Sequence, residues 1–300
     1  MPKNLGRPSS QIADVCVIVR TCARPLFLRR ALCSIHAQTV RPRQVVVVVE
    51  GDINRPAREV AENCWAGATE SLEVITNPIP VGRGSALNQG LETAHTRWIA
   101  VLDDDDTWEP TFLEKTIGCL EHTTAETQGV VTLTTVVLEN EKENKIRELQ
   151  RYPFNPSNLN AVTLEGIAGG SQFTINAFVY AREAALAIGG YNNDLPVQED
   201  WEFNIRFLKQ YSVGLLPSPL AFYHRRPQVK NIAVANTSTE QHEAVRQQII
   251  DRWLREELKT GRFGLGHLCM QAGFQREFAA AFRFKRRLLR LLQRLGLRRG

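Results

Sequence analysis

Residues 98–108 read WIAVLDDDDTW, a short apolar run that ends in four consecutive carboxylates. An apolar run of this length with polar flanks is typical of a buried strand, so the carboxylates emerge at its C-terminal end. Open α/β sheets bind their ligands at that edge. Adjacent carboxylates repel one another, and a stable cluster indicates a divalent cation or exposure to solvent. Because a buried strand delivers the cluster, we interpret it as a cation site.

The alternation of side chains along a strand predicts different roles for these aspartates. Successive residues point to opposite faces, so we expect Asp103 and Asp105 to converge on one divalent ion while Asp104 faces another part of the ligand. The alternative is an acidic turn in solvent.

The chain around the aspartates alternates strands with helices. We expect strands at 15–19, 44–49, 72–76 and 98–102, with helices at 25–38, 56–66 and 86–94. This alternation indicates βαβ units and an α/β fold with a mostly parallel sheet over residues 12–122. Beyond that unit we expect a helix at 110–122, a strand at 130–138, an exposed hairpin or loop at 139–151, a loop at 166–171, a strand at 173–180, and helices at 181–188 and 196–210.

Two short motifs carry charge at predicted helix starts. Arg83 lies in the loop GRGSAL, residues 82–87, where a helix N-terminus favours a phosphate. The loop lacks the third small residue of a dinucleotide fingerprint. Glu199 and Asp200 lie near the start of the helix at 196–210, where the helix dipole alone favours acidic residues.

The composition excludes several classes of protein. The 300 residues suit one large domain or two small ones, and 43% hydrophobic content is ordinary for a chain with a buried core. The longest purely apolar runs, such as residues 45–49, are far below the roughly 20 residues that span a bilayer. Residues 1–11 lack the apolar core of a signal peptide, so we expect a cytoplasmic protein. The six cysteines show no C-x-x-C spacing, and the sequence indicates neither a zinc site nor a disulfide framework.

Several segments, in order between residues 12 and 226, together resemble the family 2 glycosyltransferases, the inverting nucleotide-sugar enzymes with the GT-A fold. The matching segments are 17–21 with Arg24-Pro25, 34–39, 47–52, 82–91, 102–108, 188–191 and 199–201. The resemblance implies a GT-A catalytic domain over residues 12–230, with a mixed, mostly parallel sheet flanked by helices. A helical extension over residues 236–300 follows it.

The resemblance also implies roles for particular residues. The family's aspartate-x-aspartate motif maps onto Asp103 and Asp105, which would hold Mn²⁺ or Mg²⁺, and its glutamate-aspartate pair maps onto Glu199 and Asp200, with Asp200 as catalytic base. His224 would touch the diphosphate or the metal, and an exposed surface histidine is the alternative. The nucleotide end would be lined by Thr21, Arg24, Glu50, Asp52, Arg83 and Asp104.

This sequence departs from the family pattern at two strand ends. The second strand ends in Val49-Glu50-Gly51-Asp52 where the family usually has an aspartate-aspartate-glycine-serine sequence, so either Glu50 or Asp52 takes the place of the acid that reads the base. The first strand ends in Arg20-Thr21 where proline-threonine is commoner.

The implied reaction moves a sugar from a nucleotide-sugar donor to an acceptor hydroxyl with inversion. The acceptor would be a carbohydrate or a lipid-linked molecule, in the synthesis of cell-surface polysaccharide or glycolipid. A metal-dependent nucleotidyl- or phosphotransferase also places aspartates at strand ends around an ion, although no G-x-x-x-x-G-K-[ST] loop is present. The third hypothesis for the function is a carbohydrate-binding module without catalytic activity.

The positive charge belongs to the C-terminal tail. Residues 271–300 hold nine Arg and Lys against the single acid Glu277, which leaves −3 for the remainder of a chain whose net charge is +5. We therefore expect no nucleic-acid partner.

The same tail predicts an amphipathic helix over residues 274–299. On a helix of 3.6 residues per turn, bulky apolar residues gather on one side and arginines on the other. The apolar side holds Phe274, Phe278, Ala281, Phe282, Leu288, Leu289, Leu292 and Leu295, and the basic side holds Arg276, Arg283, Arg286, Arg287, Arg290 and Arg294. Such a helix is typical of an in-plane anchor, here at the inner face of a membrane. A helix that packs on the rest of the chain, or on a second subunit of a homo-oligomer, shows the same periodicity.

Overall fold

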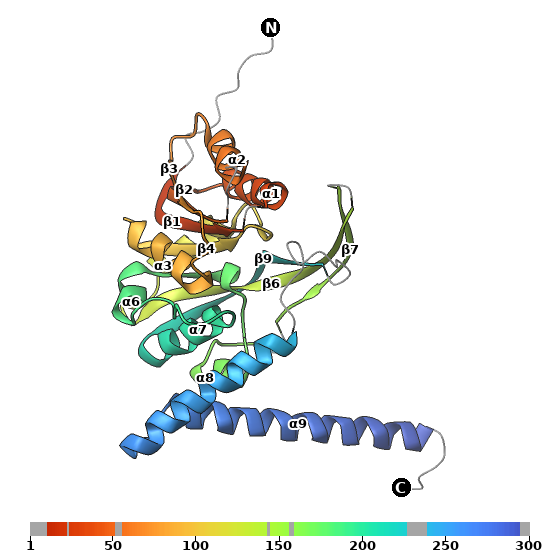
Figure 1. Ribbon diagram of the computed structural model, residues 1–300. Helices are drawn as coiled ribbons and strands as arrows, with labels where there is room; N and C mark the ends of the chain where they lie inside the picture. Colours follow the sequence, from red (N-terminus) through yellow and green to blue (C-terminus); the bar gives the residue numbers. More distant parts are fainter. Residues whose placement is uncertain are drawn as a thin grey trace.

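The computed structural model describes residues 11–22, 24–51, 56–142, 145–155, 159–226 and 239–294. The strands of these residues form one sheet in the order β3-β2-β1-β4-β8-β6-β9-β5, with β7 paired to β6 (Figure 1). The strands are β1 (Ile12–Thr21), β2 (Arg41–Glu50), β3 (Ser71–Asn77), β4 (Trp98–Asp103), β5 (Thr107–Trp108), β6 (Thr127–Lys142), β7 (Lys145–Pro153), β8 (Phe178–Ala181) and β9 (Ser212–Arg225). The α-helices are α1 (Pro25–His36), α2 (Pro56–Trp65), α3 (Arg83–Thr93), α4 (Phe112–Glu121), α5 (Leu164–Gly169), α6 (Arg182–Ala187), α7 (Glu199–Gln210), α8 (Thr239–Thr260) and α9 (Leu265–Arg294), and a 3₁₀ turn spans Ile175–Ala177.

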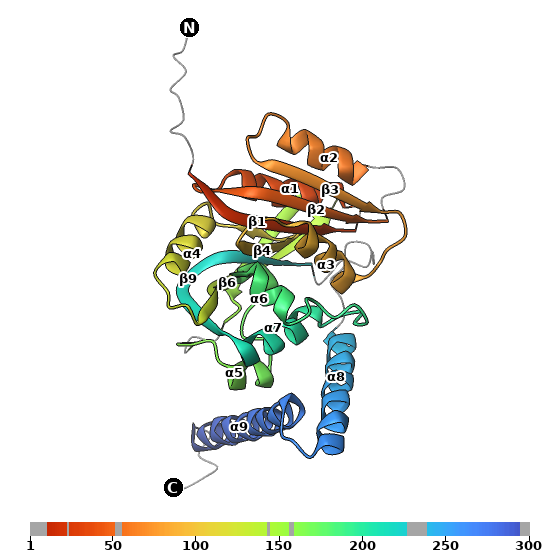
Figure 2. The ribbon, with the colours of Figure 1, turned by 90° about the vertical axis from the view of Figure 1, so that its left-hand side faces the viewer.

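The first half of the sheet is parallel and confirms the α/β prediction. Strands β3, β2, β1 and β4 pair in parallel, and the side chains of residues 45–49 in β2 are fully buried. A strand covered on both faces reads as a continuous apolar run, which is why five valines occur in succession. Helices α1 and α2 cover one face, and α3 lies on the other (Figures 1 and 2).

The order in which the chain adds strands reverses at β1. The chain moves from β1 out to β3 and then returns past β1 to form β4. Right-handed crossovers on either side of such a reversal place their helices on opposite faces of the sheet. Open α/β sheets bind their ligands beyond the carboxyl ends of the two strands at such a switch point, which here are β1 and β4.

The second half of the sheet combines parallel and antiparallel pairs, as the predicted mixed, mostly parallel sheet requires. β8 pairs antiparallel with both β4 and β6, and β6 pairs parallel with β9. The predicted strand at 173–180 is a 3₁₀ turn followed by the short β8. The predicted loop at 166–171 is largely the helix α5, because the Thr163 side chain caps it by accepting the Gly166 N–H at 3.1 Å.

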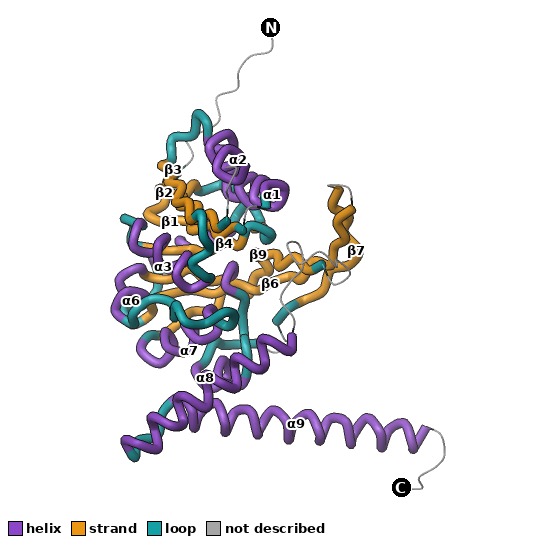
Figure 3. The backbone as a smooth tube through the Cα atoms, in the orientation of Figure 1, coloured by secondary structure: helices purple, strands orange, loops and turns teal. Residues whose placement is uncertain are grey.

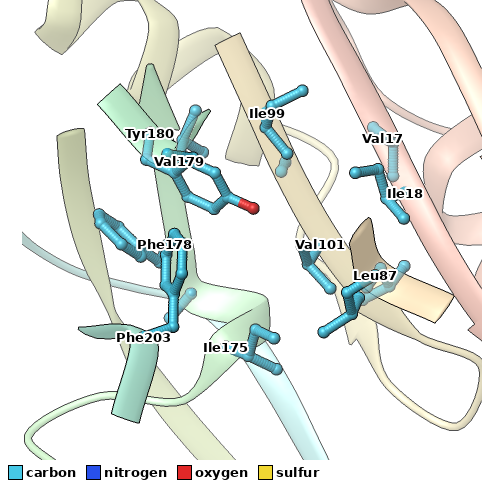
Figure 4. Packing of buried hydrophobic residues seen from close by; sticks show 14 of the residues in the cluster. Val17, Ile18, Leu87, Ile99, Val101, Ile175, Phe178, Val179, Tyr180 and Phe203 are labelled. Carbon is cyan, nitrogen blue, oxygen red and sulfur yellow. The ribbon is translucent and has the colours of Figure 1, made fainter. Parts of the chain in front are cut away.

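An aromatic core fixes the helix α7 against this sheet. Tyr180 of β8 contacts Phe203 of α7 and lies beside Ile99 of β4 (Figure 4), and Phe178 of β8 contacts Phe207 of α7. Tyr180 also shares a hydrogen bond of 2.9 Å with the hydroxyl of Tyr191. The packing places the first turn of α7 beneath the C-terminal end of β4.

Helices α8 and α9 form a separate layer, in which α9 packs on α5 and Trp253 of α8 lies against Trp201 of α7 (Figure 3). The predicted boundary between a catalytic domain and a helical extension, at residues 230–236, lies outside the described residues. Among the described helices, none is long and apolar enough to cross a bilayer.

Candidate active site

The four aspartates lie where β4 ends beside β1. β4 stops at Asp103, and the turn that follows is closed by the Asp106 N–H, which donates to the Asp103 carbonyl at 3.0 Å. Asp105 therefore lies in the turn and not on the strand, so the alternation of side chains along β4 does not determine where Asp105 points. Asp105 instead shares an arginine with Asp104.

The Arg20 side chain joins the end of β4 to the start of α7. Arg20 lies opposite Asp103 in the parallel register of β1 and β4. Its Nη2 donates to Asp103 Oδ1 at 2.8 Å, and its Nη1 donates to Glu199 Oε1 at 2.9 Å. The same Glu199 oxygen lies 3.7 Å from Arg83 Nη1. Two acidic motifs that are far apart in the chain thus meet on one buried arginine.

Asp200 occupies the first turn of α7, next to this junction. Gln198, which precedes the helix, has a left-handed φ of 68°, and among the described non-glycine residues only Gln198 has a positive φ. Such strain is concentrated at functional sites. Asp200 Oδ1 accepts the Trp201 N–H at 2.7 Å. Burial and the neighbouring Glu199 charge raise the pKa of Asp200 to about 6, which suits a proton acceptor near neutral pH.

Asp104 and Asp105 lie among guanidinium groups next to α1. Thr21 Oγ1 donates to Asp104 Oδ2 at 2.5 Å, and Arg24 Nε donates to the same oxygen at 3.0 Å. Arg24 and Arg226 both pair with Asp105. Burial raises the pKa of Asp104 to about 6 despite the Arg24 charge. Burial also acts to raise the pKa of Asp105, but Arg24 and Arg226 outweigh it and hold that pKa below its ordinary value.

The carboxylate of Glu139 organises the side chains behind Asp105. It accepts bonds from Arg30 Nη1 and Arg226 Nη1, both at 2.7 Å, and lies 2.8 Å from His224 Nδ1. Residues 139–151 were predicted to be exposed, but Glu139 is only 2% exposed. It can be buried because Arg30, His224 and Arg226 supply the hydrogen bonds that water would otherwise make to its carboxylate. Burial acts to raise the pKa of Glu139, but bonds from His224 and Arg30 lower it to about 2.

His224 is buried, so its alternative reading as an exposed surface histidine is wrong. Its Nδ1 faces Glu139, and its Nε2 lies 2.9 Å from Thr107 Oγ1. Its backbone N–H donates to Asp106 Oδ1 at 2.9 Å. Burial lowers the pKa of the His224 ring, which keeps the ring neutral at pH 7.

The sequence profile of glycosyl transferase family 2 matches residues 16–183, more than half of the chain. The chain belongs to this family. A curated relative, the amylovoran biosynthesis glycosyltransferase AmsE of Erwinia amylovora, is 27% identical over 200 residues, which are 66% of this chain and 70% of that protein. The succinoglycan biosynthesis protein ExoW of Rhizobium meliloti is 35% identical over 91 residues, 30% of this chain and 28% of that protein.

Solved glycosyltransferase structures share the fold of this glycosyltransferase. S. aureus TarS 1–349 aligns with a TM-score of 0.58 at 16% identity, over 88% of this chain and 72% of that one. The mannosyltransferase PcManGT from Pyrobaculum calidifontis, in complex with GDP-Man and Mn²⁺, aligns with a TM-score of 0.55 at 17% identity, over 100% of this chain and 85% of that one. At these identities the likeness shows the fold alone, and that fold is the expected GT-A fold.

Two other residues predicted to line the nucleotide end of this glycosyltransferase support the turn before α3. Glu50 Oε1 accepts the Val81 N–H at 2.8 Å and the Gly82 N–H at 3.0 Å. Arg83 is the first residue of α3 and not a loop residue, because the helix already begins after the Gly82 cap. The remaining candidate, Asp52, lies outside the described residues.

The three residues predicted to bind metal are not gathered around one point. Among the described residues, no three His, Cys, Asp or Glu side chains are arranged to hold an ion. The Asp103 side chain is the more open carboxylate, at 24% exposure against 11% for Asp105. Mg²⁺ is usually held by one or two carboxylates together with substrate phosphates. These carboxylates therefore fit an ion that arrives with a diphosphate.

Four charged residues of the site were missed by sequence reasoning: Arg20, Arg30, Glu139 and Arg226. A usable signal existed for three of them, since Arg20 and Glu139 directly follow the predicted strands at 15–19 and 130–138, and Arg226 directly follows β9. Such positions share the sheet edge with the aspartates. Arg30 carries no such signal, because it lies on the helix α1 between apolar neighbours.

Proposed function

We propose that this glycosyltransferase moves a sugar from a nucleotide-sugar donor to an acceptor hydroxyl with inversion at the anomeric carbon. One observation carries the proposal: Arg20 bonds both Asp103, at the end of β4, and Glu199, beside Asp200. A group that binds the diphosphate and a group that accepts a proton are thereby held next to each other. Inversion needs both groups, one toward each side of the reacting carbon.

Asp200 is the proposed general base. Its carboxylate would accept the proton of the acceptor hydroxyl while the oxygen attacks the anomeric carbon and the bond to the diphosphate breaks. Glu199 is the proposed positioning residue, since Arg20 and Arg83 hold its carboxylate. This arrangement keeps the negative charge of Glu199 beside Asp200, which raises the pKa of Asp200.

The nucleotide is proposed to bind beyond the ends of β1 and β2. Thr21 and Arg24 fix Asp104 at this edge, and Glu50 shapes the backbone before α3. Arg83, at the N-terminus of α3, is 39% exposed and is proposed to meet the diphosphate. The flanking Asp52 completes the proposed nucleotide set.

Asp103 and Asp105, with His224 nearby, are proposed to hold Mn²⁺ or Mg²⁺ together with the donor diphosphate. When bound, such an ion offsets the charge that develops on the departing diphosphate. The Glu139–His224 contact supports a metal-facing histidine, because ligating histidines usually donate their other ring N–H to a carboxylate. PcManGT, which shares the fold, was solved with GDP-Man and Mn²⁺.

Two curated relatives point to a class of pathway. AmsE is named for amylovoran biosynthesis, and ExoW for succinoglycan biosynthesis. We propose that this enzyme acts in the synthesis of a cell-surface polysaccharide or glycolipid at the cytoplasmic side of the membrane, on a carbohydrate or lipid-linked acceptor. Family membership favours this proposal over a phosphotransferase or a silent binding module.

A donor screen tests the proposed reaction. The protein is incubated with a panel of nucleotide sugars and with Mn²⁺ or Mg²⁺, and free nucleoside diphosphate is measured. Release from one donor, with an anomeric configuration in the product opposite to that of the donor by NMR, is the expected result. Release of monophosphate or pyrophosphate, or retention of configuration, contradicts the proposal.

The turnover of this enzyme should depend on pH through Asp200. A base must be ionised to accept a proton, and the pKa of Asp200 is raised to about 6. Below that pKa, kcat should therefore fall about tenfold for each unit of pH. The check is a kcat profile between pH 5 and pH 8 at saturating donor. A profile that is flat below the Asp200 pKa would show that Asp200 is not the base.

Binding of metal and nucleotide should be coupled. Since the protein alone offers few ligands, Mn²⁺ should bind weakly by itself, and it should raise the affinity for a nucleoside diphosphate at least about tenfold. Calorimetric titrations with and without Mn²⁺ measure this gain. Asp103→Asn and Asp105→Asn should each reduce the gain, whereas exposed Asp14→Asn should preserve it. An unchanged gain in both site variants contradicts the metal role.

A further inference from the structure

Helix α9 carries a row of exposed apolar side chains, which we call the α9 stripe: Met270, Phe274, Phe278 and Phe282. Their exposed fractions are 54%, 71%, 67% and 55%. Residues four apart lie on one side of a helix, so the four side chains form a continuous strip. Isolated exposed apolar residues are ordinary, but a contiguous strip of this kind marks an interaction surface.

The opposite side of α9 attaches the helix to the rest of the chain. Cys269 and Ala272 are buried, and Arg276 Nη1 donates to the Gly169 carbonyl of α5 at 2.9 Å. At 100° per residue these three positions lie roughly opposite the α9 stripe. The sequence alternative in which this helix packs its apolar face on the rest of its own chain is therefore wrong for Phe274, Phe278 and Phe282. Beyond α5, the helix continues away from the sheet (Figure 1).

The charge around the α9 stripe identifies the surface that it fits. Residues 271–300 hold nine Arg and Lys against Glu277, and the side chains of Lys285 and Arg286 are exposed. Basic residues beside an apolar strip are attracted to anionic lipid headgroups. A second copy of the chain fits less well, because a two-fold interface would bring two segments of the same positive charge together.

We propose that α9 lies in the plane of an anionic lipid bilayer, with the α9 stripe at the boundary between headgroups and acyl chains. Since no described helix can span a bilayer, α9 would lie on the surface and not cross it. The stripe supplies the apolar contact, and the basic residues supply the attraction that makes binding depend on lipid charge and salt.

The attachment of α9 also links the bilayer to the site. α9 packs on α5, and the Ile167 carbonyl of α5 accepts the indole N–H of Trp201 at 2.8 Å. Trp201 follows Asp200 in the first turn of α7. If the proposed function holds, only α5 separates the bilayer-bound helix α9 from the first turn of α7, which carries the proposed base Asp200. Such a position suits an acceptor that is linked to lipid. The docking itself does not rest on the proposed function.

Co-sedimentation of the full chain with lipid vesicles tests the proposal. At low salt the protein should pellet with vesicles of equal parts phosphatidylglycerol and phosphatidylcholine, and much less with phosphatidylcholine alone. The double variant Phe274→Ser/Phe278→Ser should bind at least about tenfold more weakly. Both positions are exposed, so the melting temperature and the circular dichroism spectrum should not change.

A matched control separates the α9 stripe from general surface hydrophobicity. Leu258, on α8, is 75% exposed and lies outside the stripe, so Leu258→Ser should bind vesicles like the wild type. Failure of the wild type to pellet, or equal pelleting of the double variant, overturns the proposal. A wild-type dimer in light scattering that the double variant converts to monomer overturns it as well, because the stripe would then join two copies. None of these results depends on sugar transfer.

Discussion

Replacing Asp200 with asparagine should lower kcat by about 10²–10⁴-fold, the usual contribution of a general base. The variant keeps the shape of the side chain, and its amide oxygen can still accept the Trp201 N–H that Asp200 Oδ1 accepts now. Donor affinity should hardly change, because a base acts on the transition state more than on the bound donor. Steady-state kinetics of kcat, together with the dissociation constant for donor and metal, measure the two effects separately.

The stability of the Asp200→Asn variant distinguishes a catalytic role from a structural one. The folded-state pKa of Asp200 is raised, so between its ordinary value and about 6 the folded chain binds more protons than the unfolded chain, and stability falls as pH rises. Asparagine carries no charge and avoids this loss. The variant should therefore unfold at the same or a higher temperature than the wild type at pH 7. Exposed Asp194→Asn should leave both kcat and melting temperature unchanged. Loss of donor affinity in step with kcat would mean that Asp200 supports the fold of α7.

The parallel half of the fold could be predicted because its signals are local. Residues 45–49 are β-branched and fully buried, and Pro25 and Pro56 begin α1 and α2 as expected for prolines in a first helical turn. The end of α6 could be predicted for the same reason. Gly189 and Gly190 follow the helix and have left-handed φ values of 84° and 64°, which favour glycine. Each of these elements depends on neighbours in the sequence.

The contacts of the acidic turn could not be predicted, because they depend on residues from distant strands. Asp105 pairs with Arg226 of the segment after β9, and Glu139 of β6 pairs with Arg30 of α1. Alternation along a strand was a poor guide to the turn, since β4 ends at Asp103. Sequence reasoning found the four aspartates and Arg24, but not Glu139 or the arginines Arg30 and Arg226 that pair with it.

The helix α5 shows a second reason why a sequence-based prediction was wrong. Its glycines indicated a loop, yet residues 164–169 are helical, with Ile167 and Ala168 buried. Tertiary contacts outweigh the weak helix propensity of glycine. The Ile167 carbonyl binds Trp201, the Ala168 carbonyl binds Arg246, and the Gly169 carbonyl binds Arg276. All three donors come from helices far away in the chain.

Replacing Arg226 with methionine should destabilise the fold by about 3–5 kcal/mol, because it removes the cation that Asp105 and Glu139 share and leaves their buried charges only partly compensated, by Arg24 and by Arg30. Arg226 is 1% exposed, and its guanidinium pairs with Asp105 and Glu139 while it lies over the Phe27 ring. Methionine keeps most of the contact with Phe27 but removes the charge. The midpoint and slope of urea unfolding at pH 7 measure the change in free energy.

A surface pair of the same chemistry provides the control for Arg226. Arg43 Nε lies 2.9 Å from Asp14 Oδ1, but their side chains are 60% and 48% exposed, so Arg43→Met should change the free energy of unfolding by less than about 1 kcal/mol. A buried carboxylate that loses its partner can also take up a proton, so the deficit of Arg226→Met should shrink as pH falls toward 5. Equal and small effects of the two variants would mean that water enters the cluster around Asp105, and a deficit that does not depend on pH would mean that lost packing on Phe27 accounts for the destabilisation.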